Sequence, residues 1–124
     1  MKKLFYSLVF TLVAFVGLQA QEIAFEQEVI DYGDITKGAD GARSYTFKNS
    51  GDKPLVIRLV KPSCGCTVAD YPKEPIAPGE SGKIKVGYDT KRVGPFNKTI
   101  EVHSNAQENG RKIVRIKGRV VEQL

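Results

Sequence analysis

Short runs in which apolar and polar residues alternate recur along most of the chain, and they are typical of β-strands. Between Lys83 and Asp89, for example, every second residue is apolar, as expected where successive side chains point to opposite faces of a strand. Each such strand is predicted to bury one face and expose the other. Three further segments show the same alternation: residues 45–48, 96–103 and 113–120.

Two other patterns complete the set of predicted elements. Residues 55–60 are apolar except for Arg58, which predicts a central strand covered on one face and partly on the other. Residues 23–25 and 29–35 supply one or two more strands. The segment 49–52, Asn-Ser-Gly-Asp, predicts a hairpin turn in which Gly51 can take a positive φ.

The spacing of an amphipathic helix does not occur over ten or more residues. Clusters of Gly, Pro, Asn and Asp separate the strands at regular intervals, and strands joined by such short connections pair antiparallel. Seven or eight strands in about 100 residues are the number that an immunoglobulin-like fold uses. The sequence therefore predicts an all-β protein, an immunoglobulin-like antiparallel β-sandwich of seven to eight strands with almost no helix.

The first twenty residues have a different pattern. Lys2 and Lys3 give a positive start, an apolar run follows over residues 4–18, and the small residue Ala20 comes next. This arrangement predicts a signal peptide over residues 1–20, cleaved near Ala20/Gln21, and one domain over residues 21–124. A membrane-spanning helix needs about 18 or more apolar residues, so no transmembrane segment is expected in the mature chain. We expect a secreted protein, in the periplasm or outside the cell.

Composition and charge narrow the function. One His, two Cys and no Trp in 124 residues argue against an ordinary Ser/His/Asp hydrolase and exclude a zinc site with two histidines. The formal net charge is +5, but Lys2 and Lys3 leave with the signal peptide, so 17 basic side chains remain against 14 acidic ones. A net charge of +3 without a basic run predicts no nucleic-acid binding.

Both cysteines lie in the segment Ser63-Cys64-Gly65-Cys66-Thr67. Export would make a disulfide plausible, and a bend at Gly65 would bring the two residues within bonding range. A bridge that closes so short a loop stabilises the fold by only ~1.6 kcal/mol, and a strained, exposed bridge is typical of labile or catalytic disulfides. Three hypotheses stay open: a local structural disulfide, a redox-active dithiol, and a soft-metal site for Cu(I).

The His and one group of basic residues are weaker candidates. His103 would be a third metal ligand if its strand ends near the cysteine turn, and is otherwise a solvated side chain on the polar face of a strand. Arg115, Lys117 and Arg119 point outward from one predicted strand. They form either a basic stripe for a partner or a solvated face that protects the sheet, and the solvated face is the favoured interpretation.

With motifs that run from Tyr32-Gly33 through Ser63-Cys64-Gly65-Cys66-Thr67 to Ile116-Lys117-Gly118, the chain resembles a bacterial exported family, the domain-of-unknown-function family 1573. The resemblance extends over essentially the whole mature chain. The resemblance implies an immunoglobulin-like sandwich similar to the major sperm protein, cilium-associated and periplasmic-chaperone domains. It implies that the two cysteines matter as a pair, and it implies no activity. The residues that carry it are Ser63-Cys64-Gly65-Cys66-Thr67, Tyr32-Gly33, Phe47-Lys48-Asn49-Ser50-Gly51, Ile76-Ala77-Pro78-Gly79, Tyr88-Asp89-Thr90, Gly94-Pro95-Phe96 with Lys98, Ser104-Asn105 and Ile116-Lys117-Gly118.

The leading functional hypothesis is an exported, non-enzymatic immunoglobulin-like module. It would bind other proteins or cell-envelope components through an exposed sheet edge or the loops around Cys64. The alternative is a periplasmic redox or Cu(I)-binding protein that uses Cys64 and Cys66, with help from His103. Apart from copper in this alternative, no cofactor is expected.

Overall fold

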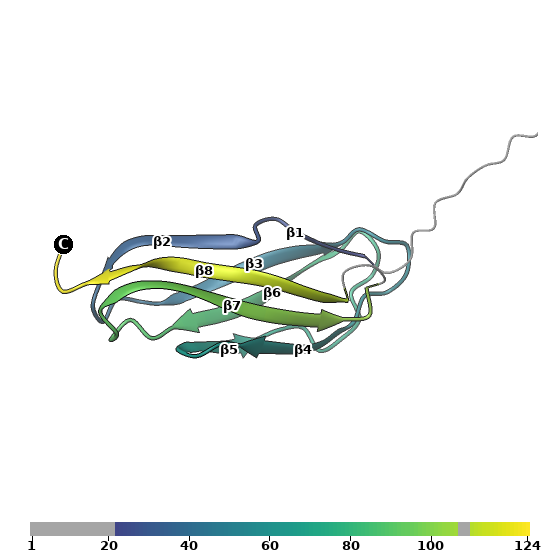
Figure 1. The fold of residues 1–124 in the computed structure, drawn as a ribbon. Helices are drawn as coiled ribbons and strands as arrows, with labels where there is room; N and C mark the ends of the chain where they lie inside the picture. Colours follow the sequence, from purple (N-terminus) through teal and green to yellow (C-terminus); the bar gives the residue numbers. More distant parts are fainter. Residues whose placement is uncertain (1–21, 107–109) are drawn as a thin grey trace, which may run out of the picture.

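Eight β-strands form two four-stranded sheets in the computed structural model, which describes residues 22–106 and 110–124 (Figure 1). One sheet has the order β1-β3-β6-β5 and the other β2-β8-β7-β4. This described part contains no helix, so the predicted all-β sandwich is confirmed. The strands are β1 (Ile23–Phe25), β2 (Val29–Thr36), β3 (Ala42–Asn49), β4 (Ile57–Pro62), β5 (Cys66–Asp70), β6 (Ser81–Tyr88), β7 (Gly94–Ser104) and β8 (Arg111–Val121).

The predicted signal peptide, residues 1–20, lies outside the described residues, as does its cleavage site. From residue 22 onward the alternation of the sequence matches the burial of the strands. In β6, Ile84 and Val86 are almost fully buried, whereas Lys83 is exposed. The core therefore lies between the sheets and collects the apolar half of each strand.

All strand pairs are antiparallel except one, because β2 runs parallel to β8. Ile30 lies opposite Ile116 in this pair, and Ile35 lies opposite Val120. The short connection between β1 and β2 joins two different sheets. A short connection forces an antiparallel arrangement only when the two strands that it joins are neighbours in the same sheet. β1 and β2 are not, so β2 can run parallel to β8.

The prediction that residues 55–60 form a central strand is wrong. β4 is an edge strand that pairs only with β7, and Leu59 is 46% exposed. The register of β4 shifts between Ile57 and Leu59, so Ile57 and Val60 are both buried although they are three positions apart. A bulge of this kind allows two residues on one strand to face one on its partner. A nearly continuous apolar run can therefore form an edge strand that buries Ile57 and Val60.

The predicted hairpin at residues 49–52 is also wrong. β3 and β4 belong to different sheets, and Gly51 is not among the glycines with positive φ. The buried side chain of Asn49 organises the turn instead. Its Nδ2 donates to the carbonyl oxygens of Lys53 at 2.7 Å and Ile76 at 2.8 Å, and its Oδ1 accepts from the Gly51 N–H at 2.9 Å.

Candidate functional site

The cysteine turn connects the two sheets. β4 ends at Pro62 in one sheet and β5 begins at Cys66 in the other. Both strands are edges of their sheets, and Figure 1 shows them together along one flank of the sandwich. The sequence placed the cysteines at a turn after a strand, but β5 itself was not recognised, because its five residues lie between two segments rich in turn residues.

Hydrogen bonds hold this turn at both ends and in the middle. The N–H of Cys66 donates to the carbonyl of Ser63 at 3.0 Å, and the N–H of Asp89 donates to the carbonyl of Gly65 at 3.0 Å. Ser63 is tied to Thr99 of β7 twice: its N–H donates to the Thr99 carbonyl at 3.1 Å, and its Oγ accepts from the Thr99 N–H at 3.1 Å. The turn is therefore a defined part of the sandwich.

Gly65 is required at the third position of the turn. Its φ of 88° lies in the left-handed region, which the third position of a type II turn demands. A Cβ at this position would also lie 3.3 Å from Nη1 of Arg92 and 3.3 Å from Cε1 of Tyr88. Arg92 itself forms an ion pair with Asp89, with 3.7 Å between Nε and Oδ2. Arg92 was not among the predicted site residues, because 26 positions separate it from Cys66.

The two thiols have different surroundings. Both cysteines are free, Cys64 is exposed and Cys66 is buried at 8% exposure. Burial raises the pKa of the Cys66 thiol, while a hydrogen bond with Ser63 and the charge of Lys98 act in the opposite direction. The candidate residues 63–66 thus form one hydrogen-bonded turn, and Thr67, the next residue, is exposed.

Lys98 is a polar residue on the buried face of β7. It alternates with Phe96 and Ile100, both buried, and lies opposite the fully buried Ile116 of β8. Within residues 22–106 and 110–124, no carboxylate lies within ion-pair distance of its ammonium group. A lysine at an apolar position of the alternation is visible in the sequence, but the pattern alone does not indicate a role for Lys98.

Aromatic rings surround this end of the core. The rings of Tyr88 and Phe96 stack with centroids 3.9 Å apart, and Tyr32 meets Phe96 edge-on at 5.3 Å. The guanidinium of Arg43 lies 4.1 Å from the centroid of the Tyr32 ring. Burial raises the pKa of Tyr32 to about 12, and a phenol with so high a pKa stays neutral in the physiological range. The turn is thus backed by a packed, uncharged aromatic layer with cations at its margin.

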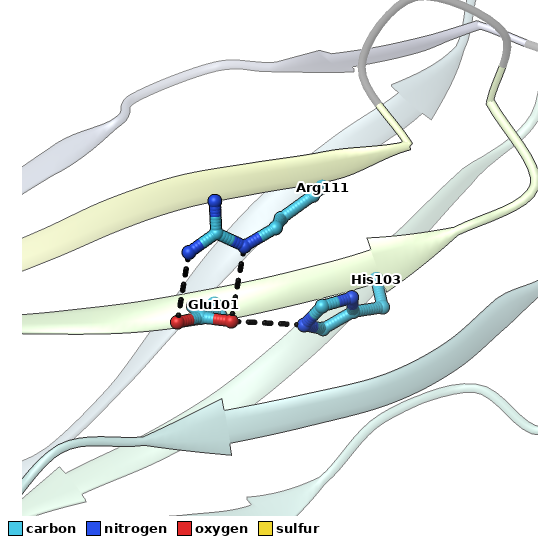
Figure 2. A network of polar contacts seen from close by, with 3 residues as sticks. All are labelled: Glu101, His103 and Arg111. Atoms are coloured by element: carbon cyan, nitrogen blue, oxygen red, sulfur yellow. Dashed lines mark hydrogen bonds and ion pairs between the residues drawn. The ribbon is translucent and has the colours of Figure 1, made fainter.

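His103 lies apart from the cysteines, in the polar network of Figure 2. Its Nε2 is 2.9 Å from Oε1 of Glu101, whose two carboxylate oxygens also accept from Arg111 at 3.3 and 3.2 Å. The cysteine turn contacts β7 at Thr99, and His103 is four positions further along this strand, a distance of about 13 Å. The strand of His103 therefore does not end near the cysteine turn, and the condition for a third ligand is not met.

The basic residues of β8 face carboxylates on the neighbouring strand. Asp31 of β2 lies opposite Lys117, and Asp34 lies opposite Arg119. Arg115 donates from Nη1 to Oδ1 of Asn97 at 3.1 Å. Opposite charges next to each other weaken the field that an acidic partner would meet, which agrees with a solvated face.

Residues 22–106 and 110–124 form no pocket, and they contain no group of three His, Cys, Asp or Glu side chains placed to hold a metal ion. The same residues include no helix that is long and apolar enough to cross a membrane.

Comparison with known proteins identifies a family and a fold. The model of a family described as protein of unknown function (DUF1573) matches residues 23–120. A Porphyromonas gingivalis W83 protein of unknown function has a similar crystal structure, with a TM-score of 0.71 and 17% identity. The match covers 86% of this chain and 50% of that one, so the chain spans half the length of that protein.

Two further structures share the sandwich. The ASH/PapD-like domain 7 of human CEP192 matches with a TM-score of 0.62 and 10% identity, over 95% of this chain and 98% of that one. The YadV chaperone matches with a TM-score of 0.58 and 13% identity, over 80% of this chain and 52% of that one. At these identities the similarity shows the fold alone. Among curated proteins, no sequence matches this chain significantly.

Proposed function

We propose that this chain, which belongs to the DUF1573 family, is an exported, non-enzymatic protein that binds an extended segment of a cell-envelope protein along β5. The N-terminal pattern of residues 1–20 supports export to the periplasm or beyond. The similarity in fold to the YadV chaperone supports an interaction role.

The observation that carries this proposal is the unpaired edge of β5. Tyr88 donates its backbone N–H to Gly41, on the β3 side of β6. In an antiparallel ladder the backbone groups of successive residues point to opposite neighbouring strands, so those of Gly87 point toward β5. Gly87 and its partner Thr67 therefore face each other, and the backbone groups of Thr67 point toward β6. The N–H and C=O of Val68 consequently point away from β6. Such edge groups can pair with an extended peptide, which adds a strand to the sheet.

The other three edges are less suited to accept a strand. β1 has only three residues, and β2 carries a register shift beside the exposed Asp31 and Asp34. β4 has a shift of its own and ends in Lys61 and Pro62. Short length, charge, bulges and proline are the features that protect edge strands from pairing. In β5 the register shifts only after Val68, and the residues before Asp70 are uncharged.

The test replaces Val68 in cells that export the protein. Val68→Pro removes the outward N–H, and proline is tolerated at an edge position whose N–H makes no ladder bond. Val68→Ala is the control, because it shortens the side chain and keeps the N–H. A photoreactive residue at Thr67 should cross-link to an envelope protein in the wild type and in Val68→Ala, but not in Val68→Pro.

Two results would contradict the proposal. One is a cross-link that persists in Val68→Pro while the circular dichroism of that variant remains native. The other is an equal yield of the same cross-link from a photoreactive residue at Ser44, which lies on β3 in the middle of the sheet. N-terminal sequencing of the exported protein tests the signal peptide separately, with Gln21 expected as the first residue.

A further inference from the structure

We propose that the cysteine turn is a thiol–disulfide exchange site, in which the exposed Cys64 attacks a substrate disulfide and the buried Cys66 resolves the mixed disulfide. The exchange oxidises the cysteine pair once per chain, so it is stoichiometric and is compatible with a non-enzymatic protein. It is independent of strand binding at β5 and uses different groups. It acts on a disulfide in a protein or a small molecule.

The first argument is the unequal exposure of the two thiols. Cys64 stands at the second position of the turn and is exposed, whereas Cys66 is 8% exposed and begins β5. A substrate disulfide can therefore reach only the sulfur of Cys64. Attack at a single exposed thiol leads to a mixed disulfide, which a second thiol of the same protein can resolve.

The second argument is the shape of the turn. In an extended strand the Cα atoms of two residues flanking a third lie about 6.6 to 6.8 Å apart, at the upper limit for a disulfide. Here the hydrogen bond from Cys66 to Ser63 and the φ of 88° at Gly65 bend the chain. The bend brings Cys64 and Cys66 closer than they would be in a strand. The backbone thus holds the second cysteine close to the first, which the resolving step requires.

The third argument is positive charge on both sides of the turn. The guanidinium of Arg92 lies over Gly65, with Nη1 3.3 Å from the position of a Cβ there. On the inner side stands Lys98, whose ammonium group has no carboxylate within ion-pair distance in the part of the chain that the structure describes. Because the thiolate is the nucleophile, the charge of Lys98 favours the reactive form of Cys66, while burial is the larger effect and raises the pKa of that thiol.

Lys98 also distinguishes an exchange site from a structural pair. Lys98 interrupts the apolar face of β7 between the buried Phe96 and Ile100, where an apolar residue would extend the core. Its charge acts on the Cys66 thiol and opposes the effect of burial on the pKa of that thiol. Lys98 is therefore a positioning residue for the resolving step, since it stabilises the thiolate of Cys66.

The exchange balances without a further reactant. The Cys64 thiolate attacks one sulfur of the substrate disulfide, the substrate S–S bond breaks, and the departing sulfur takes up a proton. The Cys66 thiol then loses its proton to solvent, and its sulfur attacks Sγ of Cys64. The mixed disulfide breaks, the second substrate sulfur leaves as a thiol, and a Cys64–Cys66 disulfide remains. The substrate disulfide is reduced by two electrons and the cysteine pair is oxidised by two.

The experiment uses the reduced, purified protein with oxidised glutathione as the substrate, acid quenching and mass spectrometry. The wild type should form the internal disulfide and release two glutathione thiols for each chain. Cys66→Ala should stop at one glutathione bound to Cys64. Lys98→Met, which keeps the aliphatic side chain, should slow resolution about tenfold by lowering the thiolate fraction of Cys66. The control Lys85→Met, on the exposed face of β6, should react like the wild type.

A second measurement needs no substitution in the core. Alkylation of the native wild-type protein, followed by peptide mapping, should label Cys64 at least about tenfold faster than Cys66. Equal labelling, a stable glutathione adduct on the wild type, or equal rates for Lys98→Met and Lys85→Met would each overturn the proposal. Uptake of Cu(I) by the reduced protein without any exchange would also overturn it, in favour of a metal site. Intact exchange in Val68→Pro would show that the exchange reaction does not depend on strand binding at β5.

Discussion

At the scale of single residues, Glu101 shows how neighbours change the chemistry of a partly exposed carboxyl group. Hydrogen bonds from Arg111 and His103 lower its pKa from 4.5 to about 2. A carboxyl whose pKa is lower in the folded state than in the unfolded state stabilises the fold at pH values above the unfolded pKa. This contribution is present above pH 4.5 and is lost as the pH falls through about 2.

We predict that Arg111→Gln raises the pKa of Glu101 toward 4.5, since Arg111 is the largest cause of the shift. Titration of the side-chain carboxyl carbon by nuclear magnetic resonance measures this directly. Lys112→Gln is the matched control, because Lys112 pairs with Glu28 at 2.9 Å and not with Glu101. An unchanged Glu101 titration in Arg111→Gln would show that the ion pair does not form in solution.

At the scale of an element, the turn after β3 depends on the side chain of Asn49. Asn49→Ala removes three hydrogen bonds from a fully buried position, and at about 1 kcal/mol for each bond the expected loss of unfolding free energy is ~3 kcal/mol. The same substitution at the exposed Asn97 should change it by less than about 0.5 kcal/mol. Urea denaturation of both variants measures the difference, and similar values for the two would refute the role of Asn49.

At the scale of the whole molecule, the stability of the sandwich should come from its core and hardly from the cysteines. Phe47 is completely buried and packs against Phe25, with ring centroids 5.8 Å apart. Phe47→Ala should cost ~3 to 5 kcal/mol, whereas closing the Cys64–Cys66 bridge should contribute no more than ~1.6 kcal/mol. Denaturation with and without a reductant measures the second value. A larger effect of the reductant than of Phe47→Ala would contradict this ranking.

The candidate site was only partly predictable. Ser63, Gly65 and the two cysteines were identified because they are adjacent in sequence and Gly favours a bend. Arg92, Asp89 and Lys98 join them only through the pairing of β5 with β6 and the contact of Ser63 with β7. Such contacts between distant segments leave no local pattern, although the lysine within the apolar alternation of β7 was a visible sign.

The sequence alone determined the class of fold and most strands, because side-chain alternation is a local property that burial of one face imposes on each strand. Only the tertiary structure decided that β4 is an edge, that β2 runs parallel to β8, and that His103 lies away from the cysteines. The physical reason is that neighbours in a sheet are chosen by packing across the whole sandwich. The same alternating pattern suits a central strand and an edge strand equally well, so the sequence does not show that β5 is an edge. The unequal burial of Cys64 and Cys66 likewise depends on how the two sheets pack together.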